Sequence, residues 1–69
     1  MERLPIQSSN LASVGYDAGT GTMELEFHSG RVYQYFDVPP AVYQGLLAAE
    51  SKGQYFHDNI KGVYRYARV

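Results

Sequence analysis

The stretch that decides this fold reads Arg31-Val32-Tyr33-Gln34-Tyr35-Phe36-Asp37-Val38-Pro39-Pro40. Alternating tyrosines are typical of a β-strand, because aromatic side chains pack well on a pleated surface. The Val38-Pro39 pair ends that strand, since proline has no N–H for the ladder and keeps the preceding residue extended. Pro40 suits the first turn of a helix, where its missing N–H is not needed. The stretch therefore predicts a junction at which a sheet ends and a helix begins.

Two further strands are expected before this junction. The first runs from Leu11 to Asp17, with Gly15 inside it as a point where another backbone or ring approaches closely. After a turn at residues 18–21, apolar and polar side chains alternate strictly from Met23 to His28. That alternation predicts a strand with one dry face and one wet face.

Two registers are open for the hairpin that joins this strand to the tyrosines. A three-residue loop with Gly30 at positive φ pairs Leu25 with Tyr33 and puts both tyrosines on the dry face. A two-residue loop instead places Gln34 beside Leu25. Burying that amide without a partner costs about 1–3 kcal/mol. We therefore favour the three-residue loop, with Tyr35 opposite Met23 and Gln34 outside.

Two short helices are expected after the junction. Across residues 41–50 apolar side chains recur at helical spacing, and Gly45 among them indicates close packing rather than a hinge. The run Ser51-Lys52-Gly53-Gln54 has the spacing of a capping box and predicts a second helix, with Gly62 as its C-cap. Three side chains of this helix are predicted to point inward: Tyr55, Phe56 and Ile60.

The ends of the chain complete a single expected domain, residues 1–69. Residues 1–8 form an extended lead-in that pairs at a sheet edge, and residues 63–69 form either a short strand or an ordered tail. The predicted fold class is α+β: an antiparallel meander of three to four strands with two short C-terminal helices packed on one face. Because the helices cover one face only, a ligand surface is expected on the opposite face or at the C-terminal edge.

Several local patterns together resemble one known family. Val14-Gly15-Tyr16-Asp17 and Leu25-x-Phe27 precede the central stretch, and Ala48-x-x-Ser51-x-Gly53-x-Tyr55-Phe56 and Ile60 follow it. From Ser9 to Tyr66 the chain resembles the KTSC family, small domains named for a C-terminal extension of some lysyl-tRNA synthetases, which also occur as free-standing domains. The function of that family is not established, and RNA binding has been suggested for it. The residues of the family motif are here Tyr33, Tyr35, Val38, Pro39, Tyr55 and Phe56, and from their expected places in the sheet, the junction and the helix we expect them to be mainly structural.

Composition limits both the stability and the location of the protein. A chain of 69 residues buries only about 60% of its unfolded surface, and without cysteine it has no disulfide to supplement the core. Seven tyrosines and three phenylalanines supply aromatic packing instead. No stretch reaches the roughly 18 apolar residues of a membrane helix, and the N-terminus lacks the features of a signal peptide. We expect a cytoplasmic monomer without membrane contact.

No constellation in the sequence points to catalysis. His28 falls at a hairpin tip, and His57 stands beside Asp58 in a helix, where neighbours point in different directions. Three or four convergent metal ligands cannot be assembled from this inventory. We therefore expect neither an enzyme nor a bound metal or cofactor.

The remaining signal is an uneven distribution of charge. Net charge is −1, yet residues 51–69 carry four cations against one carboxylate, and cations alternate with tyrosines there. Single-stranded nucleic acid is commonly bound by stacking bases on aromatic rings while cations contact phosphates. The pattern favours weak binding of RNA, either transfer RNA or another single strand, through Lys61, Tyr64, Arg65, Tyr66 and Arg68, with Lys52 as an additional candidate.

Two alternatives stay open for the same segment. In the first, it is only a terminal strand whose tyrosines pack on the domain and whose arginines keep an exposed edge soluble. In the second, the protein is an interaction module that binds a protein partner through a sheet edge or exposed aromatics.

Overall fold

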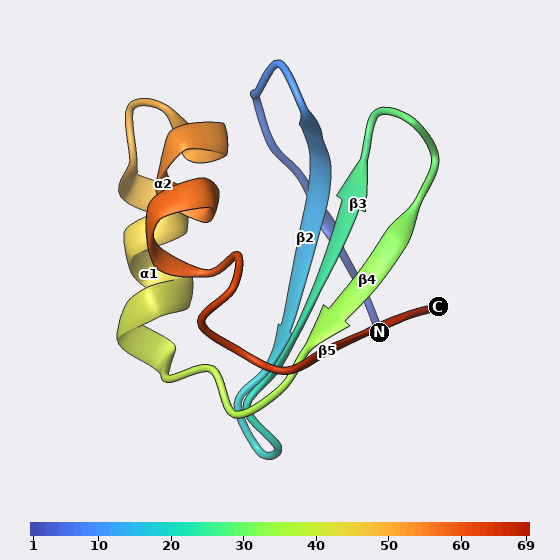
Figure 1. Ribbon diagram of the computed structural model, residues 1–69, viewed down its shortest axis with the longest axis vertical. Coiled ribbons are helices and arrows are strands. Elements are labelled where there is room, and N and C mark those ends of the chain that lie inside the picture. The colour runs from blue at the N-terminus through green and yellow to red at the C-terminus, as the bar shows by residue number, and fades with distance from the viewer.

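The computed structural model describes residues 1–69 and shows an antiparallel sheet with two helices on one face (Figure 1). The elements in chain order are β1 (Leu4–Pro5), β2 (Leu11–Asp17), β3 (Thr22–Phe27), β4 (Val32–Tyr35), α1 (Pro40–Ala48), α2 (Lys52–Asn59) and β5 (Tyr66–Arg68). The five strands lie in the order β1-β2-β3-β4-β5, so the sheet is a meander that the helices interrupt before its last strand. The predicted fold class is confirmed. Two very short edge strands bring the expected three or four strands to five.

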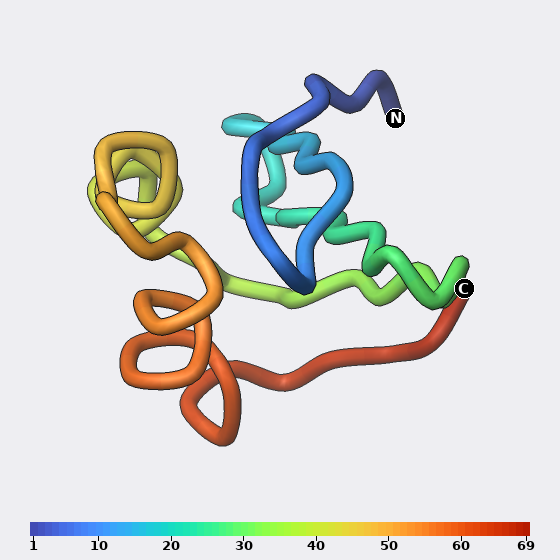
Figure 2. The backbone as a smooth tube through the Cα atoms, turned by 90° about the horizontal axis from the view of Figure 1, so that it is seen from above, coloured from blue at the N-terminus to red at the C-terminus, as the bar shows by residue number.

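The arrangement in space is a single layer of helix beside a single layer of sheet. Seen from above, α1 and α2 stand to one side, and β5 runs beside β4 on the way to the C-terminus (Figure 2). Both chain ends lie on the side of the sheet away from the helices. No helix combines the length and the apolar character that a membrane crossing requires.

The hairpin between β3 and β4 has the three-residue loop that was predicted. Gly30 has φ 92°, and the Phe27 N–H donates to the Arg31 carbonyl over 2.9 Å. Leu25 then lies opposite Tyr33. Tyr35 lies opposite Met23 in the same register, so both tyrosines face the helices as predicted.

The core lies between the inner sheet face and the helices. Tyr35 is 5% exposed and belongs to a cluster of nine buried apolar residues, to which α1 contributes Leu46 and α2 contributes Phe56. Ile60 is fully buried, whereas Tyr55 is only half-buried. The remaining members of the cluster are Leu11, Val14, Met23, Leu25 and Val38.

Close packing between the helices explains Gly45. A Cβ atom at this position would collide with the ring and hydroxyl of Tyr55, so only glycine lets that ring lie against α1. The predicted role of Gly45 is therefore confirmed. Its intrinsic cost to the helix, about 1 kcal/mol relative to alanine, is offset by the contact it permits.

The strand-to-helix junction is fixed by hydrogen bonds to Val38. This residue is 1% exposed; its N–H donates to the Gly21 carbonyl over 2.8 Å, and its carbonyl accepts the Tyr16 hydroxyl over 2.6 Å. Pro39 caps α1 and Pro40 is its first residue, as their chemistry predicts. The chain reverses at Asp37, which adopts φ 57°.

The second helix begins as predicted but ends differently. The Ser51 side chain accepts a hydrogen bond from the Gln54 N–H over 3.2 Å, which confirms it as the N-cap. The prediction of Gly62 as C-cap is wrong, because that position is taken by Ile60, whose side chain is fully buried and whose N–H bonds the Phe56 carbonyl. Gly62, with φ 77°, instead makes the turn that leads the chain toward β5.

The outer face of the sheet is less exposed to solvent than the alternating apolar and polar side chains of residues 23–28 predict. Glu24 is only 6% exposed, since Arg3 reaches across from the N-terminal segment to within 2.5 Å of one carboxylate oxygen. Gln34 donates to the other oxygen over 2.9 Å. Gly15 makes room for this segment, because a Cβ atom there would lie 2.5 Å from the carbonyl oxygen of Glu2.

Replacing Tyr35 with alanine should lower the free energy of unfolding by about 3–5 kcal/mol, because it removes a large buried aromatic side chain. Tyr33 is only partly buried, so Tyr33→Ala should lower it less. Denaturant melts of both variants measure the two losses. Wild-type stability in Tyr35→Ala would contradict the placement of this ring in the core.

Stability should fall in acid through Glu24. The hydrogen bond from Gln34 lowers the pKa of Glu24 below its ordinary 4.5, assisted by Arg3 and opposed by burial. A carboxyl group whose pKa is lower in the folded state than in the unfolded state stabilises the fold at pH values above the unfolded pKa. This stabilisation is lost as the pH falls through the pKa of the folded state. Glu24→Gln should therefore be less stable than wild type at neutral pH and lose less stability in acid. The exposed Glu50→Gln is the matched control, and identical acid dependence in both variants would contradict this role.

Candidate functional site

The C-terminal segment returns to the sheet and completes an aromatic groove on its inner face. β5 pairs with β4 so that Tyr66 lies opposite Tyr35 and Arg68 opposite Tyr33. Of the two predicted possibilities, a short strand or an ordered tail, the segment therefore forms the strand. Between this strand and α2 lies a groove of about 410 Å³, lined by Phe27, Tyr33, Tyr35, Phe56, Lys61, Gly62 and Tyr66.

The groove walls are rings in mutual contact. The Tyr35 ring lies 5.7 Å from that of Phe56 and 5.6 Å from that of Tyr66, between their centroids. The Phe27 ring lies 5.5 Å from Phe56 and 5.8 Å from Tyr33. Most of these pairs meet edge to face, an arrangement that aromatic quadrupoles favour. The rings therefore hold one another in place without closing the space above them.

Tyr66 is the exposed member of this set. It is 61% exposed, although its ring lies 5.8 Å from Tyr33 and 5.6 Å from Tyr35. A ring held by its neighbours on one side and open to solvent on the other is a platform on which a flat ligand can stack.

Three of the predicted site residues gather at this groove. Lys61 lines it, and Tyr66 and Arg68 stand opposite Tyr35 and Tyr33 in the ladder, which places them on the inner face. Neither Lys61 nor Arg68 forms an ion pair, and both are exposed. Their charges are therefore free to meet an anionic ligand.

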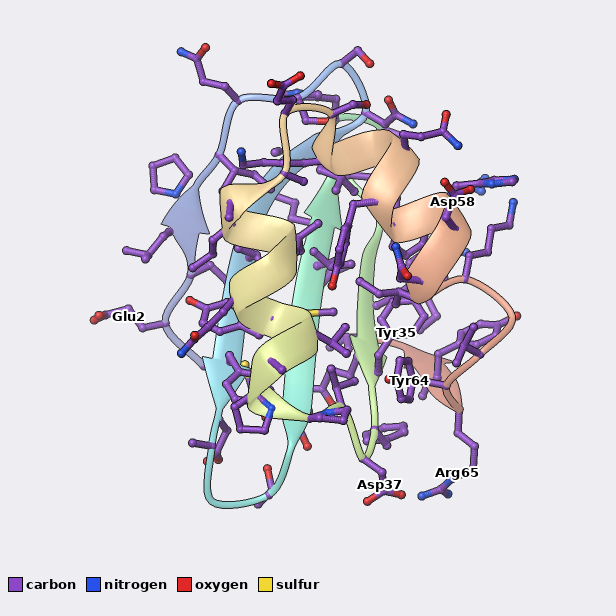
Figure 3. All side chains as sticks on the ribbon, turned by 90° about the vertical axis from the view of Figure 1, so that its left-hand side faces the viewer. Glu2, Tyr35, Asp37, Asp58, Tyr64 and Arg65 are labelled. Carbon is purple, nitrogen blue, oxygen red and sulfur yellow. The ribbon has the colours of Figure 1, made fainter.

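Arg65 has a different environment. Its guanidinium lies 3.0 Å from the Asp37 carboxylate and 5.7 Å from the centroid of the Phe36 ring. Figure 3 shows Arg65 and Asp37 side by side at the end of the molecule, below Tyr35 and Tyr64. Both charged side chains are largely exposed, so this ion pair contributes little to stability but already neutralises the cation.

Tyr64 and Lys52 lie outside the groove. Tyr64 is half-buried against the core and, with Arg65, lines a second hollow of about 570 Å³. Lys52 begins α2, and its ammonium donates to the Ala49 carbonyl over 3.0 Å. An eight-residue helix is about 12 Å long, so Lys52 stands well away from Lys61, which follows the other end.

Sequence reasoning missed part of the site. Tyr33, Tyr35 and Phe56 were predicted as structural residues, and they also line the groove, together with Phe27. Arg31 was not named as a site residue; it directly precedes β4, and its carbonyl accepts the Phe27 N–H, which continues the ladder and puts Arg31 on the same face as Tyr33.

The Tyr35 hydroxyl is held in its neutral form. Burial, assisted by the neighbouring Tyr33 and Tyr66, raises the pKa of Tyr35 to about 12. At neutral pH this group is therefore a hydrogen-bond donor and acceptor without charge.

The histidines lie elsewhere. His28 Nε2 is 2.9 Å from the Ser8 carbonyl oxygen at the hairpin tip. His57 Nδ1 is 3.3 Å from an Asp58 oxygen, so these neighbours do touch, contrary to the expectation that they diverge. The side chains of His57 and Asp58 are both more than half exposed. No group of three or more potential metal-ligating side chains converges in the structure.

The fold and groove define a small α+β domain built on a meander and an aromatic cluster, and comparison with known proteins places it in a family. The family profile of the KTSC domain matches residues 7–69. The crystal structure of a KTSC domain protein from Yersinia pestis superposes with a TM-score of 0.96, at 35% identity, over 99% of this chain and 96% of that one. The chain belongs to the KTSC domain family, as its motifs predicted.

Two kinds of relatives share the domain. An uncharacterized protein from Stutzerimonas stutzeri is 47% identical over 100% of this chain and 99% of its own length. A lysine–tRNA ligase from Trichormus variabilis is 44% identical over 91% of this chain, but that match covers only 11% of the ligase. The domain thus occurs both as nearly a whole protein and as a small part of a large enzyme.

Proposed function

We propose that this protein binds RNA weakly through the face formed by Lys61, Tyr66 and Arg68. The observation that carries the proposal is the exposed Tyr66 ring at the mouth of an aromatic groove that Lys61 lines, with Arg68 further along the same face of β5. Neither cation forms an ion pair. Aromatic platforms flanked by cations bind single strands because bases stack on the ring while cations meet the phosphates. Arg31, which directly precedes β4 and pairs with Phe27, adds a third cation to the same face.

Tyr64 and Arg65 extend this surface around the turn that precedes β5, and Lys52 lies outside it. Arg65 contributes less than Arg68, because Asp37 already balances its charge. We also propose a cytoplasmic location and a non-catalytic role, in keeping with a domain that meets RNA.

The lysine–tRNA ligases support an RNA ligand. A domain that forms 11% of an enzyme named for a transfer RNA can add affinity for that RNA as a second, linked contact. Weak binding suits such a module, and a net charge of −1 is consistent with low affinity.

A protein partner is the second candidate. β5 is the last strand of the sheet, its three residues are all exposed, and its outer edge has no neighbouring strand. Such an edge accepts an extended peptide through backbone hydrogen bonds. Binding of that kind depends weakly on salt, which separates it from phosphate contacts.

An NMR titration with single-stranded RNA, and separately with transfer RNA, tests the proposal at low and moderate salt. We expect amide shifts at residues 61–68 that fade as salt rises. Lys61→Ala and Arg68→Ala should each weaken binding and reduce the slope of log affinity against log salt by about 0.7. Lys52→Ala is the matched control and should bind as wild type does.

Two results would contradict the proposal. One is the absence of shifts with either RNA at low salt. The other is equal loss of affinity in Lys52→Ala and Arg68→Ala, which would mean that the groove face has no special role.

A further inference from the structure

One tyrosine of the aromatic groove is buried and still has a hydroxyl without a partner within the protein. Tyr35 is 95% buried, yet its hydroxyl makes none of the side-chain hydrogen bonds in the structure, whereas the Tyr16 hydroxyl bonds the Val38 carbonyl. No fully buried side-chain polar atom lacks a partner. The Tyr35 hydroxyl must therefore reach accessible space, and the space that Tyr35 lines is the groove.

The shape and the charges of the groove select the kind of group that fits it. Its volume is about 410 Å³, in the range of small-molecule sites, and five of its seven lining residues are apolar or aromatic. Aromatic walls alone would also suit a cationic ligand. Lys61 and Arg68 beside the groove repel such a ligand, and they attract one that joins a flat apolar ring to a negative charge.

A nucleotide unit has both of these properties. Its base is planar and presents ring nitrogens and carbonyl oxygens along one edge, and its phosphates are anionic. A neutral tyrosine hydroxyl can donate to such an edge without repelling the nearby phosphates.

We propose that the groove takes one unpaired nucleobase of a single-stranded RNA, with the Tyr35 hydroxyl bound to the base edge and Lys61 and Arg68 on the flanking phosphates. This inference rests on the proposed function and names the part of RNA that the site recognises. Because bases in a duplex are stacked and paired, their faces and pairing edges are not accessible, and the groove excludes double-stranded RNA.

Fluorescence anisotropy with three labelled probes tests the inference at low salt. The probes are a short single-stranded RNA, a strand of the same length in which every base is absent, and a duplex of the same sequence. We expect the abasic strand and the duplex to bind about tenfold or more weakly than the single strand, because neither offers an unpaired base that can stack on the rings.

Tyr35→Phe removes the hydroxyl and keeps the ring. It should weaken binding of the single strand by about two- to tenfold, as expected for one hydrogen bond, and should leave binding of the abasic strand and the melting temperature unchanged. Tyr43→Phe is the matched control, because Tyr43 stacks on Tyr16 at 4.7 Å and lies outside the groove. This control should bind the single strand as wild type does.

The outcomes separate this inference from the proposed function. Equal, salt-sensitive binding of the abasic and base-containing strands would keep RNA binding and overturn the base site. Unchanged affinity of Tyr35→Phe for the single strand would also overturn it. Failure of every probe to bind at low salt would overturn the proposed function itself.

Discussion

The contact of the Tyr35 ring with Phe56 and Tyr66 is the interaction on which the rest of the structure depends. It joins β4 to α2 on one side and to β5 on the other, at centroid separations of 5.7 and 5.6 Å. β5 has only three residues and pairs with β4 on one side only, so its backbone ladder alone gives it little stability. Ring packing therefore decides whether the C-terminal segment lies on the sheet and whether the groove exists.

The same rings serve two purposes that oppose each other. A chain of 69 residues without cysteine needs every large side chain it can bury. A binding surface needs apolar rings that water can reach. The structure divides the cluster between these needs, with Tyr35 and Phe56 buried and Tyr66 61% exposed. The free energy that full burial of Tyr66 would have added to folding remains available for a ligand.

Local chemistry predicted much of this fold. The cost of burying Gln34 selected the hairpin register, and the Ser51 spacing located the start of α2. Contacts between distant parts of the chain were not predictable in the same way. The pairing of Arg3 with Glu24 and that of Arg65 with Asp37 join residues 21 and 28 positions apart, and no local period encodes them. For the site, the sequence identified Lys61, Tyr66 and Arg68, but it could not show that Asp37 neutralises Arg65 or that structural tyrosines line a groove.

A double-mutant cycle between Tyr35 and Tyr66 tests the central claim most directly. The free energies of unfolding of Tyr35→Leu, Tyr66→Leu and the double variant should give a favourable coupling of about 0.5–1.5 kcal/mol, as for aromatic pairs in contact. A second cycle, between Tyr43 and Tyr66, is the control. The effects of Tyr43→Leu and Tyr66→Leu on the free energy of unfolding should be additive. Additive effects in the Tyr35–Tyr66 cycle would contradict the account, because β5 would then be held on the sheet without the ring contact.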